Sequence, residues 1–111
     1  VAARYEIKKA KNGQFYFNLR AGNNEINLSS EMYTTKASAK NGIASVQKNA
    51  GTPARYDRRV NNAGKDYFVL KAANHQVIGN SEAYNSKPAM ENGIKSVAKN
   101  APEAKVDDQV A

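Results

Sequence analysis

Hydrophobic and polar residues alternate along three short stretches of the chain and then change to a helical spacing, and this succession occurs twice. In the first half the alternation predicts strands over residues 4–9, 14–20 and 25–28. Turn signals separate these strands at Lys11-Asn12-Gly13 and at Gly22-Asn23-Asn24. The first half therefore begins as a three-stranded meander.

A helix is predicted after each meander. Apolar residues recur at spacings of four, three and four, which places them on one helical stripe: Ala39, Ile43, Val46 and Ala50 in the first half, and Met90, Ile94, Val97 and Ala101 in the second. Thr35 and Ser86 are the predicted N-caps, because a hydroxyl there can accept a hydrogen bond from an amide of the first turn. Pro88 lies just inside the second helix, where its missing N–H costs nothing.

The second half copies the first without a gap. Residues 54–101 align with residues 3–50, and roughly two positions in five are identical. The copied strands are predicted over residues 55–60, 66–71 and 76–78. After the second helix, residues 104–107 resemble residues 54–57, which predicts a closing edge strand near 104–108.

These elements predict an α+β fold in a single domain over residues 1–111. Two tandem β-β-β-α repeats plus a C-terminal strand share one antiparallel sheet, and both helices pack on one face, because each meander has one apolar face and each helix one apolar stripe. Gly42 and Gly93 lie inside the helices, where glycine costs about 1 kcal/mol relative to alanine, so we expect the helix backbone to approach the sheet or the other helix closely there; a functional hinge is the alternative. We expect a monomer, since the duplication already supplies a twofold partner.

Charge gives the first indication of function. The formal net charge is +7, distributed as about +5 over residues 1–51, about +4 over 52–101 and about −2 over 102–111. Positive charge in both halves favours binding of a polyanion, because neutralising phosphates releases counterions. A lysine-rich surface that keeps a small protein soluble is the alternative.

Composition narrows the class of protein. The sequence has no cysteine, so disulfides and thiolate metal sites are excluded, and a reducing, cytoplasmic location is expected. No apolar run approaches the roughly 20 residues that a membrane span needs. The start Val1-Ala2-Ala3-Arg4 lacks the apolar core of a signal peptide.

Three motifs occur in both copies at matching positions. They are Tyr-Phe-x-Leu with a following Ala-x-Asn (16–23 and 67–74), Ser-Glu-x-Tyr (30–33 and 81–84) and Asn-Gly-Ile-x-Ser-Val-x-Lys-Asn-Ala (41–50 and 92–101). With these motifs the chain resembles the YegP-like family of uncharacterised bacterial tandem-repeat proteins. The resemblance implies β3-α-β repeats that pair into one sheet with exchanged C-terminal strands. It implies no activity and supplies no catalytic residues.

The sequence offers little catalytic chemistry. His75 is the single histidine; it lies in a predicted turn at the position of Asn24 in the first copy, so we expect it at the surface. No phosphate-binding glycine loop, metal-ligand spacing or nucleophile beside a base is found, so no cofactor and no metal is predicted. The repeated carboxylates Glu31 and Glu82 precede the helices, where they can accept hydrogen bonds from loop amides. The alternative is a symmetric acid–base pair, which would require burial to raise the pKa of one of them. The sequence predicts that the protein is not an enzyme.

The open face of the sheet provides the leading hypothesis. If Tyr5 and Ile7 face the helices, the alternation sends two tyrosines and six basic residues outward, namely Arg4, Lys8, Tyr16, Arg20, Arg55, Arg59, Tyr67 and Lys71. Tyrosines amid basic residues can bind single-stranded nucleic acid or another polyanion. Glu6 and Asp57 on the same face weaken such a track, and an ordinary solvated face is the alternative.

A second hypothesis is a protein-interaction or assembly module. Exchange of C-terminal strands leaves sheet edges exposed, and an edge can accept a strand from a partner chain. The charged ending at residues 106–109 partly protects one edge. Salt separates the two hypotheses, because polyanion binding weakens steeply between low and moderate salt whereas strand addition barely responds.

Overall fold

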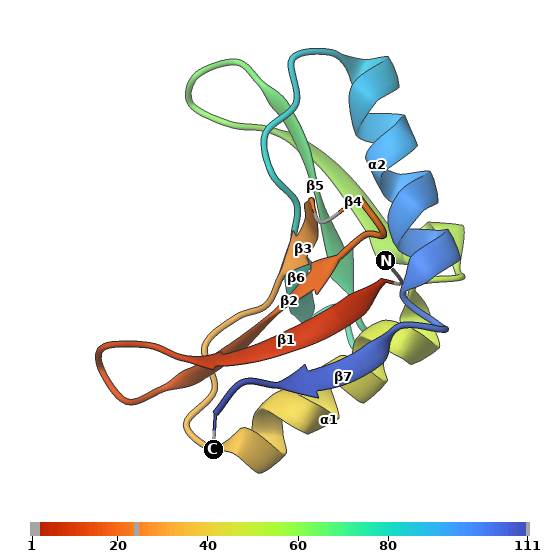
Figure 1. Ribbon diagram of the computed structural model, residues 1–111. Helices are drawn as coiled ribbons and strands as arrows, with labels where there is room; N and C mark the ends of the chain where they lie inside the picture. The colour runs from red at the N-terminus through yellow and green to blue at the C-terminus, as the bar shows by residue number, and fades with distance from the viewer. Residues whose placement is uncertain (1–2, 24, 111) are drawn as a thin grey trace.

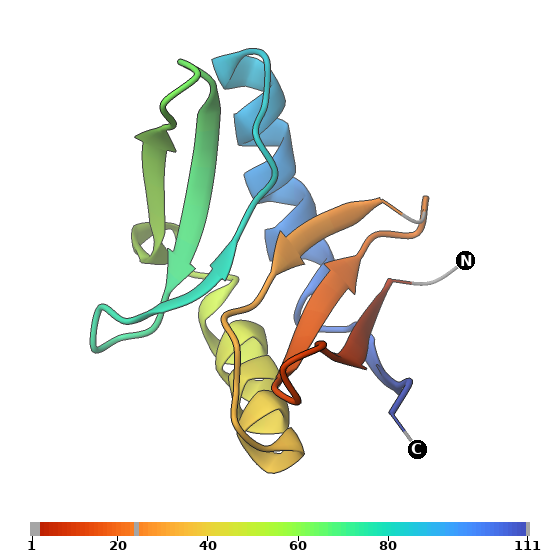
Figure 2. The same ribbon diagram turned by 90° about the vertical axis from the view of Figure 1, so that its left-hand side faces the viewer.

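The computed structural model describes residues 3–23 and 25–110 of the chain. Its strands are β1 (Arg4–Lys9), β2 (Phe15–Arg20), β3 (Ile26–Ser29), β4 (Tyr56–Val60), β5 (Asp66–Lys71), β6 (Val77–Asn80) and β7 (Lys105–Asp108). The helices are α1 (Lys36–Asn49) and α2 (Lys87–Asn100), with a 3-10 turn η1 (Pro53–Arg55) after α1. One seven-stranded sheet has the order β4-β5-β6-β3-β2-β1-β7, and both helices cover the same face of it (Figures 1 and 2). The predicted α+β architecture is confirmed.

The two meanders join at the centre of the sheet through a single residue pair. Ser29 of β3 pairs with Asn80 of β6 in antiparallel fashion, so a pseudo-twofold axis passes between the two copies. The outermost pair, β1 with β7, is parallel, which makes the sheet mixed where the sequence predicted a wholly antiparallel one. The reason is that α2 ends beside the start of β1, so β7 enters the sheet at that same end and runs alongside β1.

Both predicted N-caps are confirmed. The Thr35 hydroxyl accepts from the Ser38 amide at 3.0 Å, and the Ser86 hydroxyl accepts from the Ala89 amide at 3.2 Å. The apolar stripes of the helices are buried against the sheet, apart from small residual exposure. No helix within the described ranges is long and apolar enough to span a membrane.

Two buried tyrosines fasten the ends of the helices to strands. The Tyr56 hydroxyl of β4 donates to the Ala50 carbonyl after α1, and the Tyr5 hydroxyl of β1 donates to the Ala101 carbonyl after α2, each at 2.6 Å. Burial raises the pKa of both tyrosines well above the ordinary value, so they donate at any physiological pH. The first strand of the chain is therefore tied to its last helix.

The two helix glycines are sites of close packing, but the nearest neighbour of each is a tyrosine side chain that precedes its own helix, with a phenylalanine of the sheet behind it, and not the other helix. A Cβ on Gly42 would overlap the Tyr33 hydroxyl and lie 2.7 Å from its Cζ atom, and a Cβ on Gly93 would meet Tyr84 in the same way. The Tyr33 ring in turn stacks on Phe17 of β2, with ring centroids 6.2 Å apart. The repeated Ser-Glu-x-Tyr and Asn-Gly-Ile motifs thus contact one another in each copy.

Candidate functional site

The face of the sheet opposite the helices is uncovered (Figure 2). The side chains that alternate with the buried residues of β1, β2, β4 and β5 gather there around two carboxylates, one in each repeat. The sequence placed both carboxylates on this face. Their surroundings differ between the copies.

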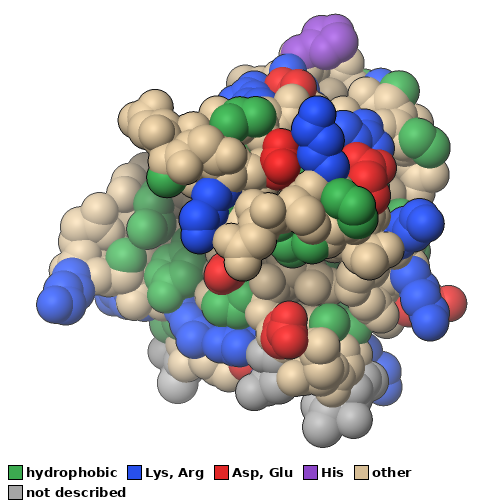
Figure 3. Space-filling view, turned by 90° about the horizontal axis from the view of Figure 1, so that it is seen from above, with side chains coloured by type: hydrophobic (Ala, Val, Ile, Leu, Met, Phe, Trp, Pro, Cys, Tyr) green, Lys and Arg blue, Asp and Glu red, His purple; other side chains and the backbone are tan. Residues whose placement is uncertain are grey.

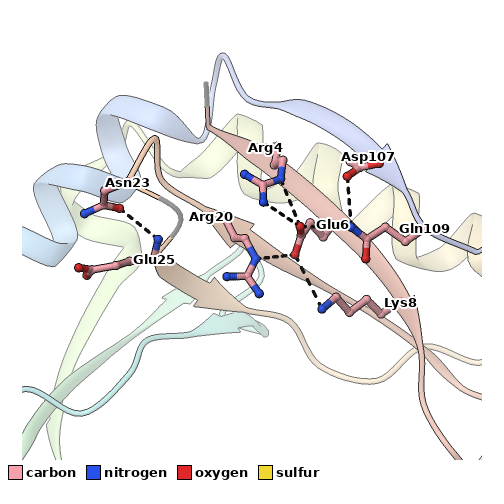
Figure 4. Close-up of polar contacts among 8 residues, drawn as sticks. All are labelled: Arg4, Glu6, Lys8, Arg20, Asn23, Glu25, Asp107 and Gln109. Atoms are coloured by element: carbon pink, nitrogen blue, oxygen red, sulfur yellow. Dashed lines mark hydrogen bonds and ion pairs between the residues drawn. The ribbon is translucent and has the colours of Figure 1, made fainter. Parts of the chain in front are cut away.

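Glu6 lies at the centre of the first cluster and is only 4% exposed (Figure 4). Its Oε2 atom accepts from Arg4 Nη2 at 3.0 Å and from Gln109 Nε2 at 3.2 Å, and its Oε1 atom accepts from Arg20 Nε at 2.5 Å. Lys8 Nζ lies 3.8 Å from Oε1. Burial acts to raise the pKa of Glu6, but hydrogen bonds and charge from Arg20 and Arg4 outweigh it and hold the pKa below the ordinary value. Glu6 is therefore ionised and gathers three predicted site residues.

Asp57 plays the corresponding part in the second cluster, in a more solvated setting. Its Oδ2 atom accepts from Arg59 Nε at 2.9 Å and lies 3.3 Å from Lys71 Nζ. The Asp57 side chain is 38% exposed. The hydrogen bond from Arg59, with help from Lys71, lowers the pKa of Asp57 below the ordinary value.

Arg55 does not join the second cluster. The strand predicted from Arg55 begins one residue later, because Pro53 opens a 3-10 turn that includes Arg55. The Arg55 Nε atom donates to Asn49 Oδ1 at the end of α1, at 3.2 Å. Its guanidinium is thus held at a helix end, and the placement of Arg55 on the open strand face was wrong.

Tyr16 and Tyr67 lie far from one another. Strands β3 and β6 lie between β2 and β5 in the sheet. The pair Ser29–Asn80 belongs to a row of paired residues that crosses the centre of the sheet, and each tyrosine lies two residues along its strand from that row. Because β2 and β5 run in opposite directions, the two tyrosines lie on opposite sides of the row. Strand spacing and rise then put their Cα atoms about 20 Å apart. Each tyrosine stands opposite a basic residue of its own repeat, Tyr16 opposite Lys8 and Tyr67 opposite Arg59. The two tyrosines belong to separate clusters and form no continuous platform.

A depression of about 510 Å³ opens next to Arg20. Its lining includes Glu25, Glu82 and Tyr84. The two carboxylates disfavour binding of phosphate in this depression. Seen from above, basic and acidic side chains are interspersed on the surface (Figure 3).

The remaining candidates for chemistry are exposed side chains. Glu31 and Glu82 are both exposed, and Glu31 accepts from Asn80 Nδ2 at 3.4 Å. The burial that would make them an acid–base pair is not found. His75 lies exposed in the β5–β6 turn with φ of 69°, as expected for a surface turn residue, whereas its counterpart Asn24 lies outside the described residues. Within residues 3–23 and 25–110, no three His, Cys, Asp or Glu residues are grouped to hold a metal ion.

Comparison with known proteins identifies the family. The chain matches "Domain of unknown function (DUF1508)" twice, over residues 10–57 and 61–108. It is 60% identical over 104 residues to the UPF0339 protein YegP of Yersinia pestis, which covers 94% of this chain and 93% of the relative. The chain belongs to the UPF0339 family. A second UPF0339 relative, from Acinetobacter baylyi, is 58% identical over 94% of both chains. The resemblance to YegP-like proteins drawn from the repeated motifs is confirmed.

Solved UPF0339 structures share the fold. The solution structure of a UPF0339 protein from Shewanella oneidensis matches with a TM-score of 0.90 and 50% identity, covering 97% of this chain and 92% of that one. The solution structure of YegP from E. coli, described as a protein of unknown function, matches with a TM-score of 0.92 and 46% identity, covering 98% and 94%. The match to UPF0339 proteins establishes the fold, and it provides no evidence for or against a catalytic activity. The division into repeats at 3–50 and 54–101 stays a prediction, since the family match is offset by about seven residues.

Proposed function

We propose that this UPF0339 protein binds single-stranded nucleic acid across the open face of its sheet. The observation that carries the proposal is the charge of that face. Five basic side chains outnumber the three carboxylates that lie among and beside them, so this part of the uncovered surface keeps an excess of positive charge: Arg4, Lys8, Arg20, Arg59 and Lys71 against Glu6, Asp57 and Asp107. Positive strand faces of this kind follow a phosphate backbone.

The two clusters define how a strand would lie. Each cluster offers one tyrosine for base stacking beside basic groups for phosphates, and the two tyrosines are about 20 Å apart, a distance that several nucleotides of single strand span. The carboxylates hold the basic side chains in place, so little side-chain freedom is lost on binding. The proposal is one of binding, without catalysis, by a monomer in the cytoplasm.

The test is an NMR titration of the ¹⁵N-labelled chain with short single-stranded DNA and RNA at low salt, repeated at moderate salt. We expect amide shifts on β1, β2, β4 and β5 that fade steeply as salt rises. Replacing Tyr16 or Tyr67 with alanine should weaken binding, because a stacked base contributes about 1–3 kcal/mol.

A matched pair of charge variants separates site binding from general attraction. Arg59→Gln removes one positive charge from the open face, and Lys48→Gln removes one from the exposed surface of α1. Arg59→Gln should weaken binding more than Lys48→Gln does. Equal losses, or shifts scattered over lysines on the helix side, would show that the open face is an ordinary solvated surface.

A further inference from the structure

The pseudo-twofold symmetry of the fold leaves one edge without its counterpart strand. β1 and β4 are equivalent, since Ile7 lies opposite Phe17 on β2 just as Arg58 lies opposite Phe68 on β5. Along β1 runs β7, whereas β4 ends the sheet within the described residues and has no segment beside it (Figure 2). We propose that the outer edge of β4 accepts an extended, acidic segment of a partner protein as a parallel strand, in the position that β7 takes beside β1.

The contacts of β7 supply the template for the main chain. β7 is parallel to β1, with Val106 opposite Tyr5 and Asp108 opposite Ile7. The Gln109 amide just beyond β7 donates to the Ile7 carbonyl at 3.2 Å. By the shared register, the Arg58 carbonyl of β4 faces the empty edge and can accept the same bond from an added strand.

The charge at the start of α2 indicates an acidic guest. Asp108 pairs with Lys36, the first residue of α1, at 2.9 Å, and Lys36 Nζ also donates to the Val110 carbonyl at 2.6 Å. The equivalent first residue of α2 is Lys87, which is exposed and forms no ion pair among the residues that the structure describes. A guest carboxylate in the position of Asp108 would meet Lys87.

Side chains of β4 itself complete the match. Arg58 occupies the position on β4 that Ile7 has on β1, so its guanidinium would lie next to the guest carboxylate as a second cation. Arg58 also forms an ion pair with Glu91 of α2. Val60 at the end of β4 is 62% exposed, a level of exposure that an added strand would reduce. Two copies of β4 edge to edge would bring arginines close together, which disfavours self-pairing. The expected guest is an extended segment with an apolar residue opposite Tyr56 and a carboxylate two residues later.

The experiment uses the chain's own strand as the probe. A synthetic peptide with the sequence of residues 103–110 is titrated into the ¹⁵N-labelled full chain, with amide shifts and amide exchange as readouts. We expect shifts centred on residues 56–60 and on Lys87, and slower exchange of the outward amides of β4. The response should survive moderate salt, which distinguishes it from nucleic-acid binding on the open face.

Two peptide variants and two protein variants define the geometry. A peptide of reversed sequence tests the parallel direction, and one with asparagine in place of the Asp108 residue tests the carboxylate; both should bind more weakly. Lys87→Gln should weaken binding about two- to five-fold, the range of an exposed ion pair. Lys99→Gln, an equal loss of charge in the last turn of α2, should leave binding unchanged.

Several results would overturn the proposal. One is the absence of shifts on residues 56–60 at the highest soluble peptide concentration. Another is a response centred on residues 4–7, which would mean that the peptide displaces β7. Concentration-dependent dimerisation through β4 in sedimentation of the chain alone would replace the partner segment by a second copy.

Discussion

Replacing Glu6 with glutamine tests whether burial makes the first cluster important for stability. The Glu6 side chain is 6% exposed, and the Arg4 and Arg20 side chains that bond it are 25% and 21% exposed. Removing one partner from a fully buried pair costs about 3–5 kcal/mol. Because water still reaches both arginines, we expect about 1.5–3 kcal/mol, near the value of one hydrogen bond to a charged group.

The pseudo-symmetric variant Asp57→Asn is the matched control. Asp57 has two basic partners as well, but its side chain is 38% exposed. Exposed ion pairs contribute at most about 1 kcal/mol, so Asp57→Asn should cost clearly less than Glu6→Gln. Urea denaturation of both variants and the parent chain at pH 7 measures the two losses.

The same assay across pH tests the charge itself. The pKa of Glu6 is lowered in the folded chain, so its stabilisation is present above the pKa of the unfolded state and is lost as pH falls through the folded pKa. The gap between parent and Glu6→Gln should therefore shrink as the solution is acidified. Equal losses for the two variants, or a gap that persists unchanged in acid, would refute the reasoning.

Two further substitutions test the packing that both repeats share. Gly93→Ala places a Cβ 2.7 Å from Tyr84 Cζ. Overpacking costs about 1–3 kcal/mol, whereas alanine regains about 1 kcal/mol of helix propensity. Urea denaturation should therefore show a net loss of up to about 2 kcal/mol in the free energy of unfolding. A variant as stable as the parent would contradict the overlap. Tyr5→Phe leaves the buried Ala101 carbonyl without its donor and should cost about 1–3 kcal/mol in the same assay. A loss below about 0.5 kcal/mol would show that the bond adds nothing net.

Sequence patterns predicted the position and the buried side of a strand or helix wherever its two sides differ in polarity. The alternation around Tyr5 and Ile7 fixes which side of β1 is buried, and hydroxyl residues before each apolar stripe mark the helix starts. The direction of β7 could not be predicted in this way. All of its residues are exposed, and a strand without an apolar face gives the same pattern whichever way it runs.

The candidate site was harder to predict than the fold, because alternation gives the side of a residue but neither its depth nor its distance. Glu6 shares a face with Arg4, yet its cover comes from Arg20 on the next strand and from Gln109 more than a hundred residues later. For Arg55 a signal was present, since Pro53 favours a turn two residues before it.

The bond between Tyr5 and Ala101 and the pairing of β1 with β7 have a consequence for synthesis of the chain. β1 leaves the ribosome before every other strand of the sheet, and β7 leaves after all of them. While the second repeat is still being made, the first lacks both its edge strand and the acceptor for its buried tyrosine. Contacts of such long sequence separation form late and slow folding, so the two repeats should fold together in one cooperative step after synthesis. A chain cut after residue 101 would lose the edge of its first repeat although every residue of that repeat were present.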